Sequence, residues 1–256
     1  MRKVAVLLMV AIVAVSGIAV LRAPVAHAQG GALALNEWVE GTLTADAFET
    51  TYTISVTAGD VILIEMYAKL GTYDLDPALK LSDSLGEQLD ENDDTIGLGA
   101  VIVFEVPADG DYTILATRAL GADGSSEGDY ILRASQITPL AVGSTVEATI
   151  YADDAQSYPS VSVLKPEADG TWAINIAQDP GSDLYANFVL QGGKDDFGSP
   201  ITLFDLDNTV GIRSGTLNVD LKGGEIYLLL ITKGFLSFGF ETTEIPVTVT
   251  IGEAAQ

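Results

Sequence analysis

The sequence predicts an all-β protein with two tandem antiparallel β-sandwich domains after an N-terminal signal peptide. Three observations support this: short apolar runs separated by turn residues, the lack of a convincing amphipathic helix, and motifs that recur roughly 110 residues apart. The chain has 256 residues, of which 48% are hydrophobic and 19% charged. That composition supplies enough apolar surface for two folded cores.

Residues 1–28 have the pattern of an export signal. Arg2 and Lys3 precede an apolar run over 4–21, and Ala26-His27-Ala28 places small residues before the expected cleavage point. We expect cleavage after Ala28, which gives a secreted or cell-surface protein without a membrane span. The alternative is an uncleaved anchor, because the apolar run is long enough to cross a bilayer.

The charge balance limits the chemistry open to the chain. Only 12 Lys and Arg oppose 36 Asp and Glu, giving a formal charge of −24, and the chain has no Cys and a single His, His27, within the leader. The mature chain therefore has no Cys- or His-based nucleophile, disulfide or zinc site. The shortage of basic residues excludes nucleic acid as a partner, because phosphate contacts need Lys and Arg. Adaptation to salty surroundings is another explanation of the acid load.

Strand signals follow one another through residues 35–135, the first predicted domain. Each run is short, rich in β-branched or aromatic residues, and bounded by Gly, Pro, Asp or Asn. Tyr112 and Tyr130 follow turn residues and are expected to begin core strands. We expect strands at 52–56, 61–67, 78–81, 100–106, 112–117 and 130–134.

The layout restarts after Pro139 and predicts a second domain over residues 140–254. Four motifs recur in the same order, and the spacing between copies drifts, which indicates that loops changed length while strand order persisted. The alternative is two unrelated sandwiches that share turn chemistry. The recurring segments are 41–45 with 143–148, 58–64 with 169–176, 73–81 with 182–190, and 109–115 with 223–229.

An ordered set of motifs in the first half resembles one bacterial family. The motifs include Asp76-Pro77-Ala78-Leu79-Lys80-Leu81, Asn92-Asp93-Asp94, Asp109-Gly110-Asp111-Tyr112 and Gly128-Asp129-Tyr130. Over about residues 35–135 they resemble the bacterial pre-peptidase C-terminal domain. The resemblance implies a small jelly-roll β-sandwich of the kind appended to secreted proteases. The second half lacks the Asp-Pro pair and the Asn-Asp-Asp triplet, and is a degenerate second copy.

The acidic segment between Asp74 and Asp94 is the one group of residues in the sequence that could form a chemically active or ligand-binding site. It holds eight carboxylates and one lysine, Lys80. If its loops converge, they offer the hard oxygen ligands that Ca²⁺ prefers, and the resemblance points the same way because some family members bind calcium. The alternative is a solvated loop of good turn formers. The candidate ligands are Asp74, Asp76, Asp90, Asn92, Asp93 and Asp94.

These observations favour a non-catalytic, secreted or cell-surface binding or accessory protein. Its expected partner is an extracellular protein or polysaccharide. We expect no enzymatic activity and no catalytic residue, because the carboxylates lie on short loops without the cleft that glycoside hydrolysis needs. The alternative function is a structural envelope or matrix component that associates through an acidic, calcium-bridged surface.

Overall fold

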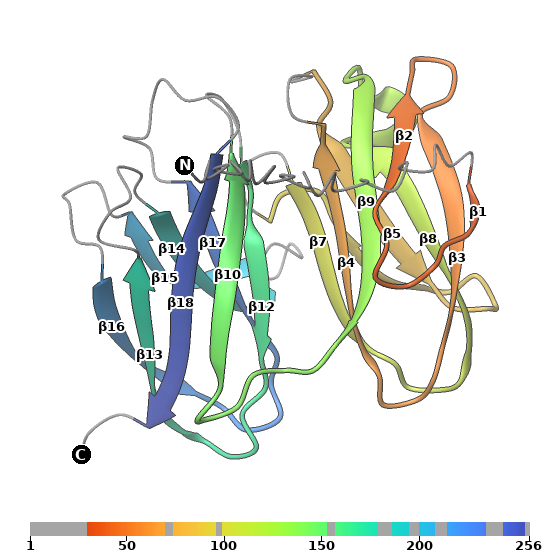
Figure 1. Cartoon of the computed structure of the whole chain (residues 1–256). Helices are drawn as coiled ribbons and strands as arrows, with labels where there is room; N and C mark the ends of the chain where they lie inside the picture. Colours follow the sequence, from red (N-terminus) through yellow and green to blue (C-terminus); the bar gives the residue numbers. More distant parts are fainter. Residues whose placement is uncertain are drawn as a thin grey trace, which may run out of the picture.

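The computed structural model describes residues 30–69, 74–95, 99–152, 157–178, 186–194, 200–207, 214–233 and 243–253. Within these ranges the elements are strands and one short 3₁₀ helix, η1 (Gly121–Asp123), which confirms the predicted all-β class. Figure 1 shows strands β1–β9 gathered in one body and β10–β18 in a second body beside it. The predicted signal peptide lies outside the described residues. Among the described residues, no helix has the length and apolar character needed to cross a membrane.

The first half forms two sheets. Strands β2, β9, β4 and β7 pair in that order as sheet I, and β1, β3, β8, β5 and β6 pair as sheet II. Neighbours are antiparallel except β1 and β3, which are parallel. The strands are β1 (Gly31–Ala32), β2 (Val39–Leu43), β3 (Glu49–Val56), β4 (Val61–Ala68), β5 (Pro77–Ser82), β6 (Gln88–Asn92), β7 (Gly99–Glu105), β8 (Gly110–Arg118) and β9 (Gly128–Ile137).

The second half also forms two sheets. Strands β12, β17, β14 and β15 make sheet III, and β11, β10, β18, β13 and β16 make sheet IV, and the described neighbouring strands of each sheet pair antiparallel. The strands are β10 (Thr145–Ala152), β11 (Ser157–Tyr158), β12 (Ser160–Leu164), β13 (Gly170–Gln178), β14 (Ala186–Lys194), β15 (Pro200–Asp207), β16 (Ser214–Leu221), β17 (Tyr227–Lys233) and β18 (Thr243–Glu253).

Both halves have the strand order of a jelly roll. From β2 onward the chain passes back and forth between sheets I and II, and its last strand, β9, returns to lie between β2 and β4. The second half repeats this order, with β18 between β10 and β13. Two sheets connected in this way are the jelly-roll form of a β-sandwich, as predicted.

The recurring sequence motifs lie on strands that hold the same place in the two halves. The first pair of motifs covers parts of β2 and β10, and the second covers parts of β4 and β13. The third leads into β5 and β14, and the fourth into β8 and β17. Residue 73 in the first copy of the third motif and residues 182–185 in the second lie outside the described residues. The domain limits 35–135 and 140–254 stay a prediction.

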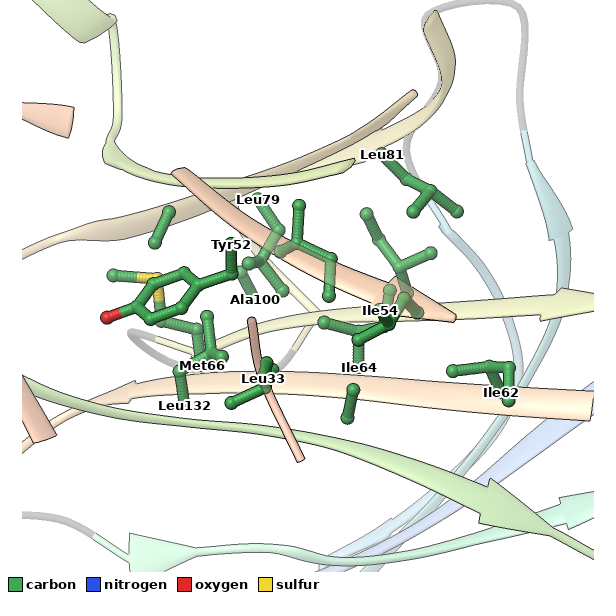
Figure 2. Close-up of a cluster of buried hydrophobic side chains, with 14 of the residues drawn as sticks. Leu33, Tyr52, Ile54, Ile62, Ile64, Met66, Leu79, Leu81, Ala100 and Leu132 are labelled. Carbon is green, nitrogen blue, oxygen red and sulfur yellow. The ribbon is translucent and has the colours of Figure 1, made fainter. Parts of the chain in front are cut away.

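The core of the first half lies between sheets I and II. Side chains from alternate positions of each strand meet there, as Figure 2 shows for Tyr52 and Ile54 from β3 facing Ile64 and Met66 from β4. Successive side chains of a strand point to opposite faces of the sheet, so only every second side chain turns toward the partner sheet. The second half has an equivalent core that includes Trp172, Phe188 and Tyr227.

Glycine at position 41 makes room for an aromatic ring. A Cβ atom at Gly41 would lie 2.3 Å from Cζ of Tyr130, the residue opposite it on β9. The Tyr130 ring is fully buried, and its hydroxyl lies 2.7 Å from the hydroxyl of Tyr52. Gly192 makes the same kind of room for the Tyr227 ring in the second half. In each half, a glycine and the tyrosine opposite it on the neighbouring strand therefore form one packing unit.

The two halves pack through the outer faces of sheets I and III. All residues of β4 are buried, although it alternates between the two faces of its sheet. Leu63 and Tyr67 point away from the first core and join a cluster that includes Val161 and Leu228 of the second half. The Tyr67 ring stacks on the ring of Tyr158, with centroids 5.4 Å apart. The four sheets therefore lie in the order II, I, III, IV.

Polar contacts flank this apolar interface. Nζ of Lys165 lies 2.7 Å from Oε2 of Glu105, and Nε2 of Gln191 donates to the carbonyl of Thr95 at 3.0 Å. Both contacts join the first half to the second. The interface thus combines an apolar centre with directional contacts at its margin, as specific protein interfaces do.

Candidate functional site

The predicted calcium ligands lie on three pieces of sheet II and its connections. Asp74 is exposed in the turn before β5, and Asp76 immediately precedes that strand. Asp90 belongs to β6 instead of a loop, which corrects the prediction that the acidic segment is mainly loop there. Asp93 and Asp94 follow β6.

Asn92 ends β6 and serves the fold. Its side chain is buried, and its Oδ1 accepts hydrogen bonds from Thr95 Oγ1 at 2.6 Å and from the backbone N–H of Val101 at 3.0 Å. These bonds hold the connection between β6 and β7. The Oδ1 atom of Asn92 is therefore engaged inside the protein, away from the predicted role of calcium ligand.

Asp76, Asp93 and Asp94 are close enough for their charges to interact. The pKa of Asp76 is raised from its ordinary value, first by burial and then by the negative charges of Asp94 and Asp93. Burial and the charge of Asp93 raise the pKa of Asp94 as well. The Oδ1 atom of Asp76 is buried and has no hydrogen-bond partner. Of the predicted calcium ligands, the fold therefore brings Asp76, Asp93 and Asp94 near one another.

The other two predicted ligands have different surroundings. Oδ1 of Asp90 accepts a hydrogen bond from the backbone N–H of Glu91 at 2.7 Å, and Asp74 faces solvent. Among the residues that the structure describes, no three His, Cys, Asp or Glu side chains are grouped closely enough to hold a metal ion. The cluster at Asp76 is thus a crowding of like charges that lacks a complete ligand shell.

A groove lies beside this cluster, on the outer face of sheet II. We name it the sheet II groove. Its lining includes Ala78, Leu115 and Thr117 from β5 and β8, together with Asp93 and Asp94. The lining residues also include Phe48, Glu49, Lys80, Glu91, Leu120 and Gly121.

One margin of the groove is held by a buried arginine. Arg118, at the end of β8, is 4% exposed, and its Nε donates to the carbonyl of Gly121 at 2.9 Å. Its Nη1 donates to the carbonyl of Ser126 at 3.1 Å, and its guanidinium lies 5.4 Å from the Phe48 ring centroid. The arginine therefore fixes the connection between β8 and β9.

That connection presents an exposed apolar side chain. Leu120 is 80% exposed and has a φ of 62°, in the left-handed region that L-residues rarely adopt. Neither Arg118 nor Leu120 was predicted from the sequence as part of a site. The sequence signal for an exposed apolar side chain was Leu120, the one leucine among the turn-forming residues of segment 119–127.

A second polar cluster lies within the interface of the two halves. Glu65 is 1% exposed, and its Oε2 accepts hydrogen bonds from Nε and Nη2 of Arg133 at 3.2 and 2.5 Å. The Tyr67 hydroxyl donates to its Oε1 at 3.1 Å, and the Arg133 guanidinium lies 4.3 Å from the Trp38 ring centroid. Burial raises the pKa of Glu65, while Arg133 and Tyr67 oppose that shift. Glu65, the one charged residue of the otherwise apolar strand β4, is thus part of a buried ion pair.

Neither a protein-family model nor a curated protein matches the sequence. Solved structures show weak likenesses. The pre-peptidase C-terminal domain of a collagenase from Bacillus anthracis has 17% identity and a TM-score of 0.35, with 41% of this chain and 94% of that chain covered. The tandem CBM51 modules of a family 98 glycoside hydrolase from Streptococcus pneumoniae have 7% identity and a TM-score of 0.28, with 84% of each chain covered.

The tandem CBM22 modules of a protein from Paenibacillus barcinonensis have 12% identity and a TM-score of 0.22, with 80% of this chain and 83% of that chain covered. At such low values these likenesses carry no inference about function. The assignment of the fold therefore rests on the sheet topology described above.

Proposed function

We propose that the chain is exported, loses residues 1–28, and acts in the medium or at the cell surface as a non-catalytic binding or accessory protein. The observation that carries this proposal is the packing of sheet I on sheet III. It fixes two jelly rolls in one stack whose outer faces, on sheets II and IV, point in opposite directions. The resemblance of residues 35–135 to the pre-peptidase C-terminal domain supports the same function.

Two measurements test this proposal. The protein beginning at Gln29 is immobilised and challenged with extracellular proteins and polysaccharides, and saturable retention of one class is expected. The same panel is screened for hydrolysis, and no turnover is expected. Turnover by the wild type that disappears in the Asp76→Asn and Asp94→Asn variants would overturn the non-catalytic assignment. Edman sequencing of the secreted protein tests cleavage after Ala28.

Calcium is proposed as a stabilising ion at Asp76, attracted there by the negative charges of Asp93 and Asp94. The support is the crowding of these carboxylates and the buried, unpartnered Oδ1 of Asp76. A divalent cation would remove the repulsion and supply the missing partner. Millimolar CaCl₂ is expected to raise the melting temperature of the wild type and to leave that of Asp76→Asn unchanged. An equal rise with MgCl₂ would indicate general screening instead of a calcium site.

The same carboxylates favour one alternative function, a structural envelope component that associates through calcium bridges. Such a protein would shift to larger species on a sizing column when calcium is added. A monomer that stays monomeric in calcium, and still retains a ligand, would favour the binding function.

A further inference from the structure

The outer faces of sheets II and III are equivalent in the two halves, but in the part of the chain that the structure describes only one of them is covered by another sheet. Sheet III holds the place in the second half that sheet II holds in the first. The outer face of sheet III is covered, because Val161 and Leu228 pack against Leu63 and Tyr67 of the first half. Within the described residues, no other sheet lies on the outer face of sheet II. One copy of this surface is thus an occupied interface, and the other is an open groove.

The sheet II groove has apolar parts that a partner could contact. On its floor, Leu115 of β8 lies directly opposite Lys80 of β5, in a row of outward-facing residues. Ala78 and Thr117 form the next row. Leu120 adds an exposed apolar side chain at the margin, on the connection that Arg118 holds in place.

The charges around the groove are mostly negative. Glu49, Asp93 and Asp94 contribute carboxylates to the lining. The Lys80 ammonium already lies 3.4 Å from a carboxylate oxygen of Glu91. The Arg118 guanidinium is buried and donates to backbone carbonyls, so it offers no surface charge to a partner. The groove is therefore complementary to a positively charged guest.

We propose that the sheet II groove binds an extended protein segment that carries lysine or arginine side chains beside an apolar one. The basic groups meet Asp93, Asp94 and Glu49, and the apolar group contacts Leu120 and Leu115. A guest of this kind relieves the repulsion that Asp93 and Asp94 exert on their neighbours. This inference rests on the proposed binding function and names its partner class.

The test uses the whole mature protein and a synthetic peptide of about ten residues in which lysine alternates with leucine or threonine. A peptide of the same length with glutamate in place of lysine is the control ligand. Calorimetry at low salt is expected to show one site for the basic peptide and none for the acidic peptide. Rising salt is expected to weaken the binding, because exposed charge pairs are screened.

Three variants locate the binding. The double variant Asp93→Asn/Asp94→Asn is expected to bind the peptide on the order of tenfold more weakly. Leu120→Gly is expected to weaken binding without lowering the melting temperature, because glycine adopts a left-handed φ without strain. The double variant Glu147→Gln/Asp220→Asn removes two carboxylates from strands β10 and β16 of sheet IV and is expected to bind like the wild type.

Other results would overturn the proposal. Equal weakening by the sheet II and sheet IV double variants would mean general attraction to an acidic surface. Binding that calcium abolishes and that Leu120→Gly leaves unchanged would mean a cation site only. Failure of the basic peptide while a polysaccharide is retained would overturn this inference but leave the proposed binding function intact.

Discussion

At the scale of single residues, the surroundings of Asp76 oppose the negative charge of its carboxylate. Its pKa in the folded protein is raised from 3.8 by burial and by Asp94 and Asp93. A raised folded pKa means that the side chain favours folding below its unfolded pKa, and that this contribution is lost as the pH rises through the folded pKa.

The Asp76→Asn variant is therefore expected to be more stable than the wild type at pH 7 in calcium-free buffer, because the repulsion is absent. The difference should vanish as the pH falls below 3.8, the ordinary pKa of aspartate. Urea unfolding at several pH values measures this. A variant less stable than the wild type at pH 7 in the absence of calcium would contradict the assigned repulsion.

At Gly41 the fold leaves no room for a side chain. Gly41→Ala places a methyl group 2.3 Å from the Tyr130 ring and its hydroxyl. The ring must shift, and overpacking of this kind costs about 1–3 kcal/mol of unfolding free energy. Gly215→Ala is the matched control, because its Cβ meets nothing within 4 Å and its φ is not positive. Equal losses for the two variants in urea unfolding would show that strand propensity, instead of the ring, governs the effect.

At the scale of elements, the sequence predicted the strands that contribute apolar side chains to a core. The runs at 52–56 and 61–67 lie within β3 and β4. Strand β6 was missed because it lies at the edge of sheet II, is largely exposed, and has the composition Gln-Leu-Asp-Glu-Asn, which lacks apolar alternation. Because β6 was not recognised as a strand, the predicted set of calcium ligands also included a residue that serves the fold. Asn92 looked like a loop ligand, but burial at the end of an edge strand engages its side chain in the fold.

The connection between β8 and β9 depends on one side chain, which gives a prediction for the element. Arg118→Met removes the hydrogen bonds to the carbonyls of Gly121 and Ser126. Charged hydrogen bonds of this kind contribute roughly 1–3 kcal/mol each. Amide exchange is expected to accelerate at Asp123 and Gly124 and to stay unchanged in β4. The matched control is Lys80→Met on the outer face of the same sheet, and acceleration in that variant too would contradict the role of Arg118.

At the scale of the whole molecule, the contact between the two halves was not predicted from the sequence. Residues 61–67 were predicted only as a strand, whereas every residue of β4 is buried. Turn spacing and strand patterns describe each sandwich alone, so they do not identify the surface that covers the outer face. Glu65 within that run receives its hydrogen bonds from Arg133 on β9 and Tyr67 on β4, both in the first half.

This interface predicts that the two halves unfold together. Leu228→Asp introduces a carboxylate beside Leu63 and Tyr67, and burying an unpaired charge there is expected to cost on the order of 3 kcal/mol. Calorimetry is expected to show one transition for the wild type and two for this variant, because the halves lose their shared surface while each keeps its own core. Leu203→Asp, a change at a 43% exposed position of β15 in the same sheet, is expected to keep the single transition. Two transitions in the wild type would mean that the interface contributes too little to couple the halves.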